Sequence, residues 1–159
     1  MVWHDGQAEY YILGEKIIFN FKFSSNIYVY DKNIGTTTMY NAPSAYTQNE
    51  GTPLSPHLRE NAAALNDHVK NNPMFLRVIP DVRHERYYRL HIGSSVPGQP
   101  RRSYLMIFDA NFNIILEHLI EHPHALRTYV ATPQGLILHK IKEKEEESVL
   151  NYYRLLCAD

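Results

Sequence analysis

The chain has 159 residues, of which 44% are hydrophobic, and 16 Lys+Arg against 17 Asp+Glu give a formal net charge of −1. This length fits one domain with a sizeable core, and the balanced charge gives no reason to expect nucleic acid or an anionic membrane surface as a partner. The single cysteine, Cys157, excludes an internal disulfide. No uncharged apolar run reaches about 20 residues, so no transmembrane segment is expected.

The first predicted group of strands occupies residues 8–41. Its clearest member, 16–23, places Ile17, Phe19 and Phe21 on one side and mostly polar residues on the other, which is the period of two of a half-buried strand. Turn-forming residues separate it from its neighbours. The four expected strands span 9–13, 16–23, 27–31 and 36–41.

A polar segment with several prolines, 42–73, predicts an inserted loop that carries one short helix. Ser55 and Pro56 are a favourable N-cap and first-turn pair, and Asn71, Asn72 and Pro73 are expected to end the helix. Apolar residues then recur at the spacing of one helix face: Leu58, Ala62, Leu65 and Val69.

A second group of strands is predicted at 74–121 and an incomplete third group at 122–157. The four strands of the second group span 75–81, 86–92, 103–109 and 112–121. The three strands of the third group span 127–132, 135–141 and 149–156. The charged run at 142–147 between the last two indicates a solvated loop.

Groups of four antiparallel strands that repeat at about 40 residues are typical of β-propeller blades. Several strands, such as 104–108, are apolar on both faces, as blades packed between neighbours require. We therefore predict an all-β fold of propeller-like, four-stranded antiparallel blades with one inserted helix, in a single domain over 1–159. A longer protein, association of copies or closure as a sandwich could complete it, and open sheet edges favour a homo-oligomer.

Several stretches resemble the last blades of a bacterial family described as domain of unknown function 4221. They include "IPDVRHERYYRLHIG", "SYLMIFDANFNIILEH", "ATPQGLILHK" and "ESVLNYYRLL". The motifs behind the resemblance are structural: a hairpin Asp at Asp31 and Asp109, the run Tyr87-Tyr88-Arg89, and Gly135 at the start of a strand.

The resemblance implies six-bladed propellers, mostly exported lipoproteins, and hence a cell-envelope location. It supplies no catalytic residues. The first residues lack a signal-peptide pattern and a lipid-attachment cysteine, so we expect the chain to be the C-terminal portion of a larger propeller.

Six of the nine arginines lie between Arg77 and Arg102. Arg86, Tyr87, Arg89 and His91 on the 86–92 strand are the candidate ligand-binding residues. An aromatic ring could stack on a sugar, and a guanidinium could hydrogen-bond to an anion or hydroxyl group. The alternative is that these arginines pack along aromatic faces between blades.

The histidines of "EHLIEHPHALR" are the only metal-ligand candidates, namely His118, His122 and His124. A metal needs three or four converging ligands, and no second cluster completes the set. We therefore expect these histidines to be polar residues at a strand end, with no metal and no cofactor.

The predicted function is an uncharacterised binding or scaffolding module of the bacterial cell envelope, with a protein or carbohydrate ligand. The alternative is a glycan-acting hydrolase or lyase whose site is shared with further blades. No nucleophile motif such as G-x-S-x-G is present, so a non-enzymatic role is favoured.

Overall fold

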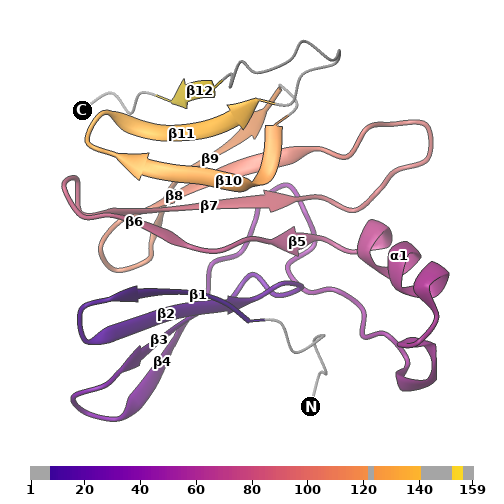
Figure 1. The fold of residues 1–159 in the computed structure, drawn as a ribbon, viewed down its shortest axis with the longest axis horizontal. Coiled ribbons are helices and arrows are strands. Elements are labelled where there is room, and N and C mark those ends of the chain that lie inside the picture. Colours follow the sequence, from indigo (N-terminus) through magenta and orange to yellow (C-terminus); the bar gives the residue numbers. More distant parts are fainter. Residues whose placement is uncertain (1–7, 122–123, 141–151, 156–159) are drawn as a thin grey trace.

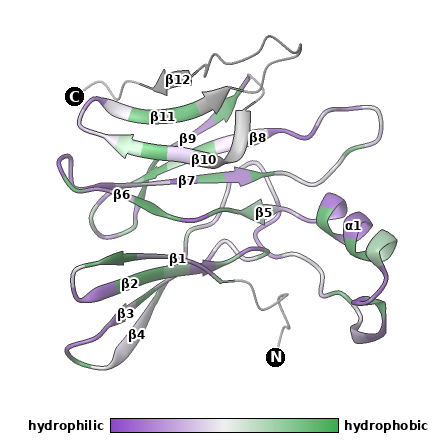
Figure 2. Cartoon of the chain, viewed as in Figure 1, coloured by the Kyte–Doolittle hydropathy of each residue, from purple (hydrophilic) through white to green (hydrophobic). Residues whose placement is uncertain are grey.

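The computed structural model describes residues 8–121, 124–140 and 152–155, with side chains at 8–121 and 129–138. Three antiparallel sheets follow one another along the chain and lie one above the other (Figure 1). Hydrophobic residues run through the strands of all three sheets (Figure 2). No helix among the described residues has the length and apolar composition to cross a membrane.

The first sheet has the order β1-β2-β3-β4. Its strands are β1 (Ala8–Leu13), β2 (Lys16–Phe21), β3 (Ile27–Asp31) and β4 (Thr36–Tyr40). The period of two in β2 is confirmed, but its buried face is the one with Ile18 and Asn20, not the one with Phe19. The second sheet lies on that side, where the Asn20 Nδ2 atom donates to the Phe75 carbonyl over 3.0 Å.

The inserted helix begins later than Ser55 predicted. Ser55 and Pro56 start only a short 3-10 helix, η1 (Pro56–Leu58), and α1 spans Ala62–Asn71. Asn61 is the N-cap, because its side chain accepts a hydrogen bond from the Ala64 amide over 3.0 Å. No residue of α1 is fully buried, so the predicted apolar face covers little of the core.

The second sheet has the order β5-β7-β8-β9, with β6 also paired to β7. Its strands are β5 (Met74–Phe75), β6 (Ile79–Asp81), β7 (Arg86–Ile92), β8 (Ser103–Phe108) and β9 (Ile114–Ile120). The prediction of a single strand at 75–81 is wrong, because residues 76–78 belong to no strand and separate β5 from β6.

Aspartates organise the hairpin turns, including the two that the resemblance singled out. Asp31 accepts the Asn33 amide over 2.9 Å in the β3–β4 turn. Asp109 accepts the amides of Asn111 and Asn113 in the β8–β9 turn, both over 2.8 Å. Each of these hairpins consists of the last two strands of its sheet, β3–β4 in the first sheet and β8–β9 in the second.

The third sheet has the order β10-β11-β12. Its strands are β10 (His124–Thr132), β11 (Gly135–Lys140) and β12 (Tyr152–Leu155). The three strands predicted for this group are therefore present, and residues 149–151 and 156 of the predicted last strand lie outside the described residues. The charged run at 142–147 lies outside the described residues.

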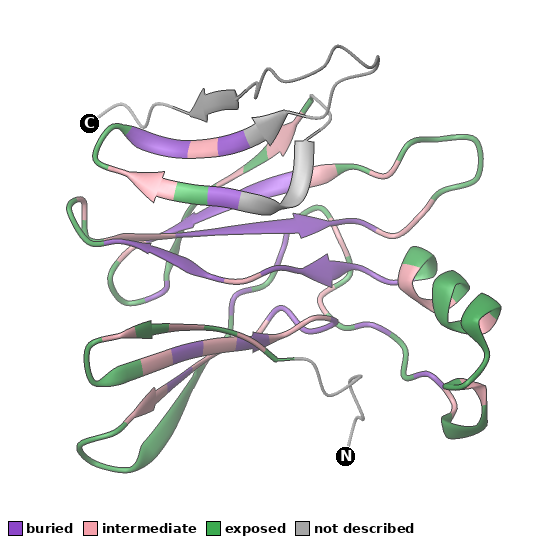
Figure 3. Ribbon diagram, in the orientation of Figure 1, coloured by how far each residue is buried: buried purple, intermediate pink, exposed green. Residues whose placement is uncertain are grey.

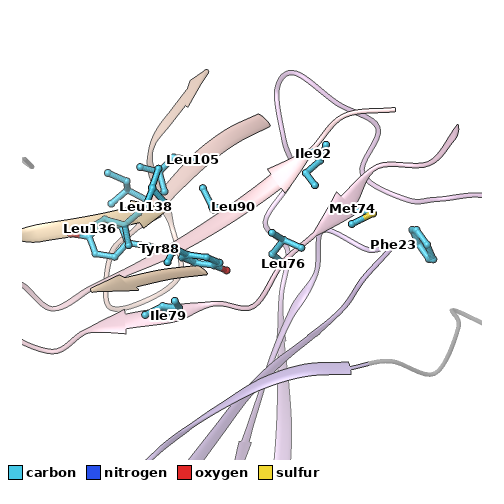
Figure 4. Close-up of a cluster of buried hydrophobic side chains, with 12 residues drawn as sticks. Phe23, Met74, Leu76, Ile79, Tyr88, Leu90, Ile92, Leu105, Leu136 and Leu138 are labelled. Carbon is cyan, nitrogen blue, oxygen red and sulfur yellow. The ribbon is translucent and has the colours of Figure 1, made fainter. Parts of the chain in front are cut away.

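The second sheet is covered on both faces. One cluster packs Ile18, Ile27 and Val29 of the first sheet against Met106 and Phe108. On the opposite face, a second cluster joins the second sheet to the third (Figure 4). It includes Tyr88, Leu90, Leu105, Tyr129, Leu136 and Leu138. Strands β5, β6, β7 and β8 are accordingly the most continuously buried, whereas β9 and α1 are largely exposed (Figure 3).

This architecture confirms the predicted all-β class. The sheets are antiparallel, the first has four strands, and the described residues hold one short α-helix. The described residues form no closed barrel, because the outer strands of each sheet are paired on one side only.

Candidate ligand-binding site

The four residues predicted to bind a ligand lie on β7, but on two different faces. Tyr87, Arg89 and His91 share one face, as their spacing predicted, and this face lies toward the first sheet. Arg86 shares the opposite face with Tyr88. Tyr87 is half-buried, and its ring stacks on Phe112 with the centroids 4.4 Å apart.

Arg89 is completely buried and joins two sheets. Its guanidinium donates to the Ser25 carbonyl over 2.6 Å and to the Ala42 carbonyl over 3.0 Å, and both acceptors belong to the first half of the chain. The same group lies over the rings of Phe75 and Phe108, at 4.9 and 5.2 Å from their centroids. Burial lowers the pKa of Arg89 to about 9, so the group stays charged at neutral pH.

His91 is also fully buried, and it is bonded to a carboxylate. Its Nε2 atom donates to the Glu117 Oε1 atom over 2.7 Å. Burial lowers the pKa of His91 despite the opposing effect of Glu117, so the ring is neutral at neutral pH. Burial alone would raise the pKa of Glu117, but hydrogen bonds from His91, Ser44 and the Ala45 amide hold it below its usual value.

Glu117 fixes the loop at 44–50 against the second sheet. Its two oxygens accept from the Ser44 hydroxyl over 2.6 Å and the Ala45 amide over 2.8 Å. The Ser44 hydroxyl in turn accepts the amides of Tyr46 and Thr47, over 3.0 and 3.1 Å. Glu117 on β9 therefore fixes the position of Tyr46 through the hydroxyl group of Ser44.

A row of stacked rings leads from this loop into the core. The ring of Tyr46 stacks on Tyr104 with centroids 5.2 Å apart, and Tyr104 stacks on His91 at 5.0 Å. His91 stacks on Phe75 at 5.3 Å. Phe75, His91 and Tyr104 are direct neighbours across β5, β7 and β8. Tyr46 remains 60% exposed, so it forms the solvent end of the row.

A cavity of about 310 Å³ opens beside Tyr46 and Tyr104. The loop between β7 and β8 supplies its opposite wall, at the same end of the sheets as α1 (Figure 1). Its lining is rich in hydrogen-bonding groups and consists of Tyr46, Thr47, Gln48, Gly93, Ser94, Val96, Gln99, Pro100, Arg102 and Tyr104. The size lies within the range of small-molecule sites.

Neighbouring segments hold the far wall of the cavity in place. Arg101 donates to the carbonyls of Gly93 and Asn72, both over 2.8 Å, and so ties the β7–β8 loop to the chain after α1. A Cβ atom on Gly93 would lie only 3.3 Å from the Thr47 methyl group, so a glycine lets the two walls approach. Arg102, by contrast, is exposed at the cavity and has no ion pair within the described residues.

The candidate metal ligands do not converge in the described part of the chain. His118 is exposed on β9. His122 lies outside the described residues, and His124 begins β10 with an undescribed side chain. No group of three or more potential metal ligands occurs among the residues whose side chains are described.

The residues that line the cavity were not predicted from the sequence. Tyr46 and Gln48 lie in the segment interpreted as an irregular loop, and Gln99 and Arg102 lie in the loop that follows β7. A lone aromatic residue in an otherwise polar loop was the available signal for Tyr46. His91 was predicted, but it supports the ring row from beneath and does not line the cavity.

Stacked antiparallel sheets with a loop-lined cavity at one end define the chain as an all-β protein of the layered-sheet class. More particularly, residues 6–119 match the family described as "Domain of unknown function (DUF4221)", and the chain belongs to this family. The predicted family is thus confirmed.

A crystal structure of a DUF4221 family member from Bacteroides vulgatus ATCC 8482 has a similar fold. The similarity covers 94% of this chain with a TM-score of 0.70 and 15% sequence identity. This chain covers 46% of that protein, so it spans about half of its length. No curated protein matches the sequence.

Proposed function

We propose that this chain is a non-enzymatic binding module and that its ligand is a carbohydrate held in the cavity beside Tyr46. The observation that carries the proposal is the ring of Tyr46, which is 60% exposed although one of its faces is stacked on Tyr104. The apolar face of a sugar ring packs well on such a fixed aromatic surface.

The polar lining supports a sugar over an apolar ligand. The amide groups of Gln48 and Gln99 and the hydroxyl group of Thr47 can each donate and accept hydrogen bonds, as ring hydroxyls require. Arg102 adds several donors in a planar arrangement. The site is also preorganised, because Glu117 fixes the loop that carries Tyr46 before any ligand arrives.

The composition of the lining favours binding over catalysis, the alternative being a hydrolase or lyase. Glycoside hydrolysis commonly uses two carboxylates beside the scissile bond, and no Asp, Glu or His lines this cavity among the described residues. The nearest such pair, His91 and Glu117, is packed beneath Tyr104, and its polar atoms are engaged with protein groups.

The variant Tyr46→Ala tests the proposal. We expect it to weaken binding of a neutral oligosaccharide by about tenfold, because it removes the stacking surface and leaves the core intact. A panel of neutral oligosaccharides is titrated by calorimetry, and the best binder is used for the comparison. Ile34→Ala is the control, because Ile34 is 70% exposed in the β3–β4 turn and does not line the cavity. Equal losses in both variants, or no binding by the wild type, would contradict the proposal.

We also propose that the three sheets are consecutive blades of a propeller in the bacterial cell envelope, as the resemblance implies. The second sheet, covered on both faces, provides support. The outward face of the first sheet carries Ile12 and Met39 at 55 and 57% exposure, and this apolar face suits a further sheet of the same kind. The related crystal structure is about twice as long as this chain.

This arrangement predicts how the isolated chain behaves. Without a further sheet, the outward face of the first sheet can be covered only by a second copy, so we expect dimers or larger species at high concentration. Light scattering measures the mass, and Ile12→Lys should shift the equilibrium toward the monomer. A wild type that stays monomeric at every concentration would refute this expectation.

A further inference from the structure

The segment between β5 and β6 joins all three sheets. The Leu76 amide still donates to the Leu90 carbonyl of β7 over 2.9 Å, but the next two residues leave the regular pairing, which frees the backbone groups of Arg77 for other partners. Such interruptions often lie beside functional sites, because they redirect backbone and side chains locally.

Both backbone polar groups of Arg77 bond to side chains of the neighbouring sheets. Its amide donates to the Glu9 Oε2 atom of β1 over 2.8 Å. Its carbonyl accepts the hydroxyl group of Tyr129 from β10. Burial raises the pKa of Tyr129 far above its usual value, with a further contribution from the charge of Glu9, so this hydroxyl remains a donor.

A second cavity, of about 420 Å³, lies at this junction. It is separate from the cavity beside Tyr46 and is lined by Ala8, Glu9, Tyr10, Arg77 and Tyr129. Each of the three sheets thus contributes to its wall through an edge strand or the interruption beside one.

The side chains of Arg77 and Glu9 in this cavity do not use all of their hydrogen-bonding groups. The Arg77 Nε atom is buried without a hydrogen-bond partner, although buried polar atoms are normally paired. Glu9 binds the Arg77 amide, but within the described residues it forms no ion pair with the Arg77 guanidinium. An arginine, a glutamate and two tyrosines therefore surround one open cavity.

We propose that this junction binds a carboxylate-bearing sugar, a uronic acid or a close analogue. The ligand carboxylate accepts hydrogen bonds from the Arg77 guanidinium, whose planar shape matches a carboxylate. A ring hydroxyl donates to the Glu9 carboxylate, and the sugar ring packs on Tyr10, which is 59% exposed.

Arg77→Ala tests this site without removing the contacts that join the sheets, because those use the backbone of residue 77. Glucuronate, glucose and propionate are titrated into the full chain and followed by NMR. We expect glucuronate to bind about tenfold more tightly than the other two, and Arg77→Ala to weaken it by about tenfold. Arg83→Ala, in the exposed β6–β7 turn, should bind like the wild type.

The remaining variants separate this site from the cavity beside Tyr46. Tyr46→Ala should bind glucuronate normally, whereas Arg77→Lys, which keeps the charge but not the planar donor group, should bind it with intermediate affinity. Equal binding of glucose and glucuronate, no binding at all, or undiminished binding by Arg77→Ala would each overturn the proposal. The comparison of glucose with glucuronate is repeated in the Tyr46→Ala variant, so that sugar bound beside Tyr46 does not enter it.

Discussion

Replacing Arg89 with alanine is expected to lower the free energy of unfolding by about 4 kcal/mol, because the change leaves a cavity and removes two buried hydrogen-bond donors. The carbonyls of Ser25 and Ala42 would lose their partner, and the rings of Phe75 and Phe108 would lose the group between them. Chemical denaturation at pH 7 measures the loss.

Two further variants separate these contributions. Arg83→Ala is the matched control, since Arg83 is exposed in a turn, and it should change stability by less than about 0.5 kcal/mol. Arg89→Met fills most of the space without the donors, so it should lie between the wild type and Arg89→Ala. If Arg89→Ala were as stable as Arg83→Ala, Arg89 would not join the two sheets.

Glu117→Ala is expected to cost about 3 kcal/mol at pH 7, because it breaks a buried and hydrogen-bonded charge. The side chain of Glu117 is only 6% exposed and serves His91, Ser44 and the Ala45 amide. All three groups would be left without this acceptor, and the loop that carries Tyr46 would lose its anchor. Glu121→Ala, on an exposed glutamate just beyond β9, is the control.

The same cluster makes the wild type sensitive to acid, and the sign follows from the pKa shifts. The pKa of His91 is lower in the folded state than its usual 6.5, so its contribution to stability is present above pH 6.5 and is lost as the pH falls below it. The pKa of Glu117 is lowered from 4.5, so its contribution to stability is present above pH 4.5 and is lost as the pH falls below that value.

Unfolding free energies measured across this pH range check the expectation. The wild type should lose stability from about pH 6.5 downward. Its advantage over Glu117→Ala should shrink as the solution becomes more acidic. A wild-type stability that is flat between pH 7 and pH 4, or that rises on acidification, would contradict the assignment of His91 as a neutral buried ring.

The strands could be predicted from the sequence because their pattern is local. The bounds of β3 match the expected strand 27–31, and the period of two placed Tyr87, Arg89 and His91 on one face. The pattern could not show what covers that face. Arg89 reaches carbonyls that lie 64 and 47 residues away in the chain, and no local signal gives their distance.

The cavity beside Tyr46 was not predictable for the same reason. Ser44 and Glu117 are separated by 73 residues, and only their contact turns a polar loop into a fixed wall. The interruption at Arg77 was missed because the run from Phe75 to Asp81 is rich in apolar residues and has no turn-forming residue near Arg77, so it was interpreted as one strand. The helix start was misplaced because Ser55 and Asn61 are both acceptable caps, and the geometry favours the second.

The way in which Arg77 is held has a consequence for how this protein can diversify. Glu9 and Tyr129 bind the backbone amide and carbonyl of this residue, and any amino acid except proline supplies the same two groups. The side chain is therefore free to vary without loosening the contact between the sheets. A substitution at this position can therefore change the chemistry of the junction cavity while the contacts between the sheets stay the same.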